Sequence, residues 1–377
     1  MSPLPIPVVS PVQAYLGYRA EMDAAIERVL TSGWYILGQE VAAFEAAFAS
    51  FAEMAEMIGV GNGTDAIHLA LRTLEIGQGD IVVTASHTAV ATVAAIELAG
   101  ATAVLVDVEP QSYTLDPHKL DETLAQLATE GTPARAVIAI HIYGHPCDTI
   151  ALASICERHG VALIEDCAQA HGARIGNRHV GSAGQAACFS FYPTKNLAAF
   201  GDGGSVGFND AALAARCRAL REYGWQDRYL SDLQGMNSRL DELHAAMLAV
   251  RLGHLDAEME RRRAVARIYD AGLADHVATP PVRPGCEHAY HLYVVRTRDR
   301  DSLARALAAE GIGTGVHYPA PVHSQRAYAG RIRIGAGGME VTERIAGEIL
   351  SLPMHGFLPD ADAHRVVEAV ARVFRNV

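Results

Sequence analysis

The chain has 377 residues, half of them hydrophobic and 20% charged, which is the composition of a globular protein. Its formal net charge of −12 argues against nucleic acid or an anionic membrane as a main partner, but it does not exclude a phosphorylated ligand in a locally positive site. One hydrophobic core rarely serves so long a chain, so we expect a large domain and a smaller one.

The six cysteines are scattered along the sequence and form neither C-x-x-C pairs nor a zinc-ligand spacing. This usage is typical of small buried thiols in a reducing compartment. The N-terminus has no basic region followed by a long apolar run, so no signal peptide is predicted. The longest apolar stretch, residues 89–106, contains Glu97 and Gly100 and favours a helix and a strand over a membrane span. We therefore expect a cytoplasmic protein.

Strand-like and helix-like segments alternate between residues 57 and 208. The strand candidates are mostly continuous apolar runs, at 57–60, 81–85, 103–107, 136–141, 161–165, 187–191 and 205–208. Such runs suit strands that are covered on both faces. Helical patterns follow Gly63, with Thr64 or Asp65 near the cap, and recur at 88–99, 118–129 and 149–159. The alternation predicts a mostly parallel, right-handed α/β sheet that binds its ligands at the carboxyl ends of the strands.

The pattern changes after residue 240. Apolar residues at helical spacing predict a long helix that begins near Leu240, and a proline-rich break follows at 280–284. A strand at 291–296 and helices near 301–310, 339–349 and 361–375 complete an α+β pattern. We predict a large α/β domain over residues 1–250 and a small C-terminal α+β domain over 251–377, with the N-terminal segment free to pack on the small domain.

Lys195 lies in a loop that follows an apolar strand, among aromatic residues and glycines. Burial there would disfavour the ammonium form, and a neutral amine is what imine formation requires. A surface lysine in a turn is the commoner reading of a single lysine taken alone.

Asp166 ends a predicted buried strand, where an unpaired carboxylate is costly. A protonated pyridine nitrogen is a suitable partner, and the pairing keeps the ring able to accept electrons. The alternative is an aspartate that caps the next helix.

The segment 61–65 (Gly-Asn-Gly-Thr-Asp) opens the first well-defined helix, and a helix N-terminus is a ready anion site. A phosphate would suit Gly63 and Thr64, and Ser190 could add a hydroxyl. A plain capping turn is the alternative. The phosphate site, the strand-end carboxylate and the loop lysine follow in that order on one predicted sheet. This combination argues against explaining each of them separately, as a capping turn, a helix cap and a surface lysine.

These residues carry a resemblance to a known family. The chain resembles the DegT/DnrJ/EryC1/StrS sugar aminotransferases, which use pyridoxal 5′-phosphate (PLP) and have the aspartate aminotransferase-like fold, fold type I of the PLP-dependent transferases. The similar segments are 32–38, 61–71, 140–144, 164–172, 190–204, 237–241 and 317–319. The lysine and aspartate motifs are highly specific together, and the C-terminal segments are weaker.

The resemblance implies a role for each matching residue. Lys195 would form the Schiff base with PLP and move the proton, and Asp166 would pair with the pyridine nitrogen. The other implied cofactor contacts are Gly63, Thr64 and Ser190 for the phosphate, Gln169 near the ring hydroxyl, and His87 stacked on the ring.

Asn237 resembles a phosphate ligand that the neighbouring subunit contributes, which implies a homodimer with shared active sites. The alternative is that Asn237, in the segment Asn-Ser-Arg, caps the helix starting near Leu240; if Asn237 binds phosphate instead, Ser238 could take the cap.

The lysine motif, residues 190–199, resembles the branch that aminates C3 of a nucleotide-linked 3-keto-deoxysugar with glutamate as the donor, except that Ala198 replaces a glycine. Tyr192, Tyr223, His317 and Tyr318 match regions that face the sugar. Histidines 317 and 323 lack a metal-ligand spacing, so no metal is predicted. The alternatives are a C4 sugar aminotransferase, a cyclitol or inosose aminotransferase, a sugar dehydratase, which has histidine at the lysine position, and a non-catalytic regulatory homologue.

Overall fold

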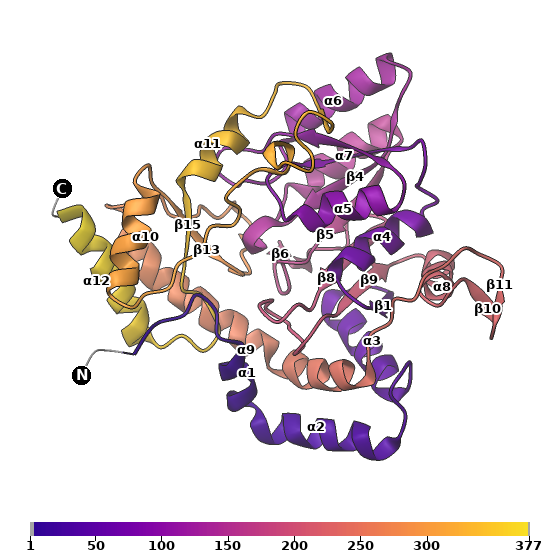
Figure 1. Cartoon of the computed structure of the whole chain (residues 1–377), viewed down its shortest axis with the longest axis horizontal. Coiled ribbons are helices and arrows are strands. Elements are labelled where there is room, and N and C mark those ends of the chain that lie inside the picture. The colour runs from indigo at the N-terminus through magenta and orange to yellow at the C-terminus, as the bar shows by residue number, and fades with distance from the viewer. Residues whose placement is uncertain (1–3, 376–377) are drawn as a thin grey trace.

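The computed structural model describes residues 4–375; residues 1–3 and 376–377, the outer ends of the two predicted domains, lie outside the described part of the chain. An eight-stranded sheet with the order β1-β9-β8-β5-β4-β2-β3-β14 forms the centre of the larger part of the molecule (Figure 1). Its strands are β1 (Glu56–Val60), β2 (Ile81–Ala85), β3 (Thr102–Val106), β4 (Ala134–Ile140), β5 (Ala162–Asp166), β8 (Ala186–Ser190), β9 (Gly204–Phe208) and β14 (Arg333–Ile334). The seven predicted strands up to residue 208 are all present, each within two residues of the predicted ends.

The sheet is parallel except at one strand. β9 runs antiparallel to both of its neighbours, β1 and β8. A loop without a crossover helix connects β8 to β9, and a parallel pair would need such a crossover. The mostly parallel sheet of the expected fold is confirmed, with β9 as the reversed strand.

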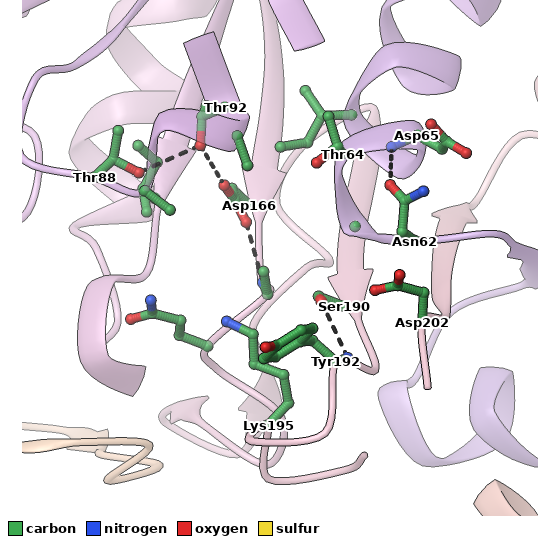
Figure 2. Close-up of a pocket in the computed structure, with 17 residues that line it drawn as sticks. Asn62, Thr64, Asp65, Thr88, Thr92, Asp166, Ser190, Tyr192, Lys195 and Asp202 are labelled. Carbon is green, nitrogen blue, oxygen red and sulfur yellow. Dashed lines mark hydrogen bonds between the residues drawn. The ribbon is translucent and has the colours of Figure 1, made fainter. Parts of the chain in front are cut away.

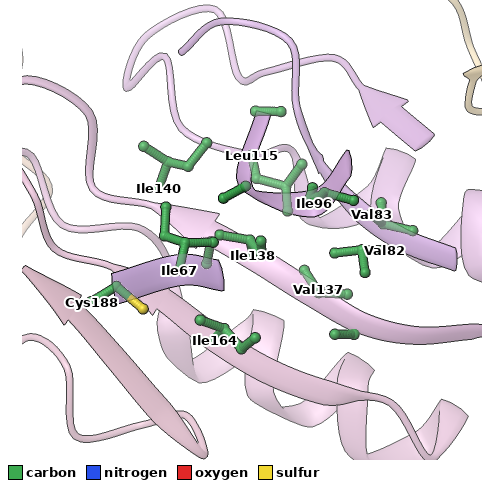
Figure 3. Close-up of a cluster of buried hydrophobic side chains, with 14 of the residues drawn as sticks. Ile67, Val82, Val83, Ile96, Leu115, Val137, Ile138, Ile140, Ile164 and Cys188 are labelled. Carbon is green, nitrogen blue, oxygen red and sulfur yellow. The ribbon is translucent and has the colours of Figure 1, made fainter. Parts of the chain in front are cut away.

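Helices cover the sheet and close its core. Every residue of β2, β8 and β9 is buried, which requires cover on both faces of the sheet. Figure 3 shows aliphatic side chains from α4, α5 and neighbouring strands meeting in this core. The helices of this part are α1 (Pro11–Gly17), α2 (Arg19–Ser32), α3 (Gln39–Ala52), α4 (Gly63–Thr73), α5 (Val90–Leu98), α6 (Pro117–Thr129), η1 (Ile142–Gly144), α7 (Thr149–His159) and α8 (Ala211–Leu220).

The long helix α9 (Glu242–Leu273) connects the sheet region to the C-terminal region. In Figure 1 it runs beneath the sheet region toward α12, and α2 and α3 pack against it. The helix is continuous through residue 250, where the sequence predicts the domain division, so that division stays a prediction. The remaining elements are β13 (Tyr293–Arg296), α10 (Arg300–Ala309), η2 (Val322–Ser324), α11 (Glu340–Glu348), β15 (Ile349–Leu352) and α12 (Asp360–Arg375).

The C-terminal region has its own core, in which β13 pairs antiparallel with β15. Ile6, near the N-terminus, packs into this core and forms a bridge with Ile312. The region also reaches back, because β14 pairs with β3 in the large sheet. Three short strands, β6 (Arg174–Ile175), β7 (Arg178–His179) and β12 (Cys286–Glu287), form a small sheet, and β10 (Trp225–Asp227) pairs with β11 (Leu230–Ser231). Among residues 4–375, no helix is long and apolar enough to cross a membrane.

Candidate functional site

A cavity of about 520 Å³ lies at the carboxyl ends of β5 and β8 and at the start of α4. Figure 2 shows side chains from these three elements and from the β8–β9 loop extending into it. The residues that line it are Asn62, Gly63, Thr64, Asp65, Ile67, Thr88, Ala89, Ala91, Thr92, Ile140, Asp166, Ala168, Gln169, Ser190, Tyr192, Lys195 and Asp202. Lys195 and Asp166 therefore share one cavity with the helix start that the sequence suggested as an anion site.

Asp166 is the last residue of β5 and is buried. Its Oδ1 accepts a hydrogen bond from the Ala168 N–H at 3.1 Å, and its Oδ2 accepts one from the Thr92 hydroxyl at 3.0 Å. Burial raises the pKa of Asp166, while both donors favour its charged form. The alternative that it caps the next helix is wrong, because the element that follows β5 is the strand β6. A cation in the cavity would suit this carboxylate.

Lys195 lies in the loop between β8 and β9, where its N–H donates to the Tyr192 carbonyl at 2.8 Å. Burial lowers the pKa of its amine to about 8, although the nearby Asp166 carboxylate opposes the shift. The amine is therefore closer to its neutral, nucleophilic form than an exposed lysine. The sequence contains one other lysine, Lys119, which pairs with Asp107 at 2.9 Å and does not line the cavity.

The start of α4 supplies the anion end of the cavity. Thr64 and Asp65 lie in the first turn, near the cap as predicted, and the cap itself is Asn62, whose side chain accepts from the Asp65 N–H at 2.8 Å. The earlier N–H groups of the first turn, those of Gly63 and Thr64, remain for a ligand. A Cβ at Gly63 would lie 2.7 Å from Cβ of Ser190, so glycine keeps this end of the cavity open.

The donor set fits PLP. The helix start and the Ser190 hydroxyl match the phosphate, the Lys195 amine matches the aldehyde, and Asp166 matches the ring nitrogen.

Gln169 is held between two tyrosines. Its Oε1 accepts from the Tyr143 N–H at 2.6 Å, and its Nε2 donates to the Tyr318 hydroxyl at 3.0 Å. His87 is buried, and its Nε2 lies 2.6 Å from the Tyr143 hydroxyl. His87 does not line the cavity, whereas its neighbours in sequence, residues 88 and 89, do. The stacking of His87 on the ring stays a prediction.

The predicted sugar contacts are spread over several places. Tyr192 lines the cavity and is 52% exposed. Tyr223 is exposed, its ring is tilted against that of Trp225, and it does not line the cavity. Neither His317 nor Tyr318 lines the cavity; His317 Nδ1 lies 2.8 Å from the Ser351 hydroxyl, and Tyr318 contacts Gln169.

Asn237 is exposed and lies outside the lining of this cavity. The alternative that Asn237 or Ser238 caps the following helix is wrong, because the residue at the cap of α9 is Asp241. Ser238 instead donates its hydroxyl to Asp65 at 2.6 Å and accepts from the Gly61 N–H at 2.9 Å. Its role is to hold the loop that precedes α4.

Sequence reasoning missed Thr92, Asn62 and Asp202 in the cavity. Thr92 comes from α5 and meets Asp166 only because β5 and that helix are brought together by the sheet. The polar residues at 61–65 do contain a signal for Asn62, since asparagine is among the preferred cap residues.

His141, Glu165 and Cys167 form a buried group with the composition of a metal site. Nδ1 of His141 accepts from the Cys147 N–H at 3.0 Å, so its Nε2 carries the proton and faces Glu165 at 3.1 Å. The Glu165 carboxylate also accepts from three backbone N–H groups in residues 181–184. The His141 and Glu165 side chains already have partners, and their contacts anchor the end of β5 next to Asp166.

Comparisons with known proteins agree with this geometry. The sequence profile of the DegT/DnrJ/EryC1/StrS aminotransferase family matches residues 18–371. The chain is 45% identical over 368 residues to the dTDP-3-amino-3,4,6-trideoxy-alpha-D-glucose transaminase of Streptomyces venezuelae, with 97% of this chain and 95% of that protein covered. It is 45% identical over 365 residues to the erythromycin biosynthesis sensory transduction protein EryC1 of Saccharopolyspora erythraea, with 96% and 98% covered. The crystal structure of S. venezuelae DesV in complex with a ketimine intermediate matches with a TM-score of 0.93 at 44% identity, over 98% of both chains.

Proposed function

The chain belongs to the DegT/DnrJ/EryC1/StrS aminotransferase family, and from this membership we propose that it transfers an amino group from glutamate to the C3 keto group of a nucleotide-linked deoxysugar. It is a PLP-dependent aminotransferase. When bound, PLP supplies the electron sink for the reaction. The observation that carries the proposal is the single cavity lined by Lys195, Asp166 and the start of α4.

Each end of the cavity has its own task. Lys195, with a pKa lowered to about 8, would hold the cofactor and would move a proton when its amine is free. Asp166 would favour a proton on the ring nitrogen. Gly63, Thr64 and Ser190 would bind the phosphate, and Gln169 would lie near the ring hydroxyl.

Two observations support a 3-keto sugar as the acceptor. The relative from S. venezuelae is named for a 3-amino sugar and is 45% identical over nearly the whole chain. The lysine motif, residues 190–199, has the pattern of the C3 branch apart from Ala198. Tyr192, which is at once part of the cavity lining and half exposed, is suited to meet the sugar at the cavity mouth.

The test is an acceptor comparison. The purified chain, supplied with PLP and glutamate, is offered a nucleotide-linked 3-keto sugar, a 4-keto sugar and a keto-cyclitol, and the aminated products are identified by mass spectrometry. We expect amination of the 3-keto sugar only, and none of it by Lys195→Ala. Lys119→Arg, at the other lysine, serves as the control and should retain activity. Amination of the cyclitol alone would reassign the substrate.

The regulatory alternative makes an opposite prediction. The relative EryC1 is named a sensory transduction protein, yet a regulator needs neither a lysine of lowered pKa nor a carboxylate placed opposite it. A colourless purified chain with no borohydride-reducible cofactor would favour that alternative. The dehydratase alternative is opposed by Lys195 itself.

We also propose a cytoplasmic homodimer in which Asn237 completes the phosphate site of the partner subunit. Its support is the exposure of Asn237 and its absence from the cavity of its own chain. Mixing equal amounts of Lys195→Ala and Asn237→Ala chains should restore about a quarter of wild-type activity, because half of the dimers are mixed and each has one intact site. If each variant is inactive alone and the mixture restores nothing, Asn237 acts in the site of its own chain; an Asn237→Ala chain that is fully active alone places it outside the site.

A further inference from the structure

Lys195 also lines a second cavity, whose other residues have no role in the proposed reaction. Besides the large cavity, it lines a small one of about 30 Å³, room for about one water molecule. This small cavity is also lined by Arg251 and Glu258 of α9. The two charged residues thus lie beside Lys195 in a cavity that Asp166 does not line.

Arg251 and Glu258 form a buried ion pair. They lie seven residues apart, two turns along the same face of α9, and are 5% and 4% exposed. The guanidinium contacts the carboxylate through two bonds, Nε to Oε1 at 3.2 Å and Nη2 to Oε2 at 2.9 Å. The planar fork of arginine suits this geometry, which lysine cannot reproduce.

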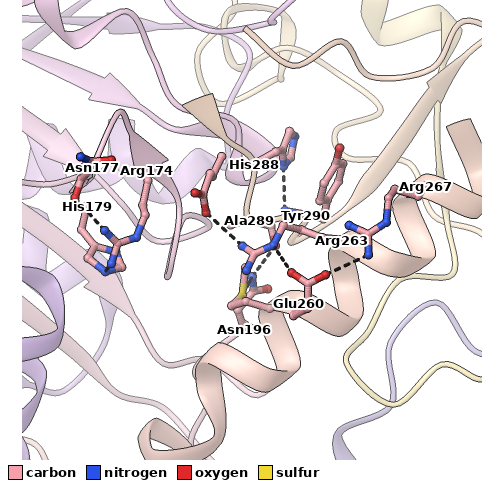
Figure 4. Close-up of polar contacts among 12 residues, drawn as sticks. Arg174, Asn177, His179, Asn196, Glu260, Arg263, Arg267, His288, Ala289 and Tyr290 are labelled. Atoms are coloured by element: carbon pink, nitrogen blue, oxygen red, sulfur yellow. Dashed lines mark hydrogen bonds and ion pairs between the residues drawn. The ribbon is translucent and has the colours of Figure 1, made fainter. Parts of the chain in front are cut away.

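The guanidinium has a third contact, with the backbone next to Lys195. Its Nη2 donates to the Asn196 carbonyl at 3.1 Å. The Asn196 side chain in turn donates to the Ala289 carbonyl at 2.9 Å, the bond visible in Figure 4. On the other side, the Lys195 N–H is held by the Tyr192 carbonyl. The backbone is therefore fixed both before and after the lysine.

A buried ion pair is weak evidence for stability, because desolvation of two charges can cancel their attraction. An apolar pair would fill the same space without that cost. What an apolar pair cannot do is donate to the Asn196 carbonyl. The contact with the lysine loop therefore distinguishes this pair from a purely structural one.

We propose that Arg251 is a positioning residue for Lys195, acting through the Asn196 carbonyl, and that Glu258 holds the guanidinium in place. The inference rests on the proposed role of Lys195. The same helix also reaches the C-terminal region, where Arg262 donates to the Tyr290 carbonyl at 2.9 Å and to the Met354 carbonyl at 3.3 Å. Helix α9 thus joins the lysine loop to the C-terminal region.

The test compares the double variant R251M/E258M with its single variants and with a control on the same helix. The control is E260M/R267M, which removes an exposed ion pair of the same spacing from the same helix. The full-length chain, freed of cofactor, is methylated with formaldehyde and cyanoborohydride across a pH series. Peptide mass spectrometry then follows Lys195, with Lys119 as the internal reference.

The single variants leave one charge buried and unpaired, so their melting temperatures should fall by roughly 4–6 °C. The double variant should recover most of the lost melting temperature, yet its Lys195 should titrate about one pH unit higher than in the wild type. Below the transition, this shift corresponds to a roughly tenfold slower methylation of Lys195. The control should match the wild type in both measurements. A double variant that is stable and titrates like the wild type would overturn the proposal.

If the double variant does not fold, Arg251→Lys gives the answer. It keeps a cation beside Glu258 but loses the forked contact, so Lys195 should again titrate higher than in the wild type. An unchanged titration overturns the proposal. Because no substrate or cofactor is present, a wrong sugar assignment would leave these results unaffected.

Discussion

The amine of Lys195 should titrate more than two pH units below an ordinary lysine. Burial lowers its pKa from 10.5 to about 8, and the Asp166 carboxylate limits the shift. At pH 7, a group of pKa 8 is neutral in about one molecule of 11, whereas a group of pKa 10.5 is neutral in about one of 3,000. The structure therefore predicts a roughly 300-fold larger neutral fraction at Lys195 at this pH.

Reductive methylation of the cofactor-free chain between pH 6 and pH 11 would measure this titration directly. The rate at Lys195 should level off above pH 8, and Asp166→Asn should move the transition to lower pH, because burial is then unopposed. A rate that keeps rising to pH 10.5 in the wild type would refute the reasoning. So would an Asp166→Asn variant with a higher transition.

Three further predictions concern the cavity and its surroundings. Gly63→Ala should weaken PLP binding at least about tenfold, because the added Cβ would lie 2.7 Å from Cβ of Ser190. The control Gly253→Ala in α9, where an added Cβ meets no atom within 4 Å, should bind PLP like the wild type. Equal PLP affinities of the two variants, measured by titration, would contradict this prediction. Thr92→Val removes a donor to the Asp166 carboxylate, so PLP affinity should fall severalfold, and an unchanged dissociation constant would argue against it. Stability should fall as the pH drops from 6.5 toward 4, by up to about 1.4 kcal/mol per pH unit for each buried histidine, because the unfolded state then binds more protons than the folded one. Burial lowers the pKa from 6.5 to about 4 for His87, His145 and His355, and to about 3 for His171. Urea midpoints that stay constant over this pH range would contradict the prediction that these histidines are neutral in the folded state.

The sequence was sufficient where one residue or one short run determines the structure. Continuous apolar runs located the seven strands, because strands buried on both faces leave little room for polar residues. Asp166 was found because a carboxylate at the end of such a strand is unusual. The direction of β9 follows from its connection to β8, which spans only the 13 residues 191–203 and has no helical pattern.

Contacts between distant segments escaped prediction. Thr92 and Asp166 are 74 residues apart and meet across the sheet. Arg251 and Glu258 have the composition of an exposed helix face, and nothing local indicates that the lysine loop covers them. The contact between Gln169 and Tyr318, 149 residues apart, is of the same kind.

The reversed strand β9 has a consequence for how this site can vary. Ser190, the last residue of β8, is paired with Gly204, the first of β9, so the segment that contains the lysine begins and ends at one point of the sheet. Insertions or deletions within that segment would change the reach of the amine while leaving the Ser190 hydroxyl where it is. Length variation there can thus change the position of the amine without moving the Ser190 end of the cavity.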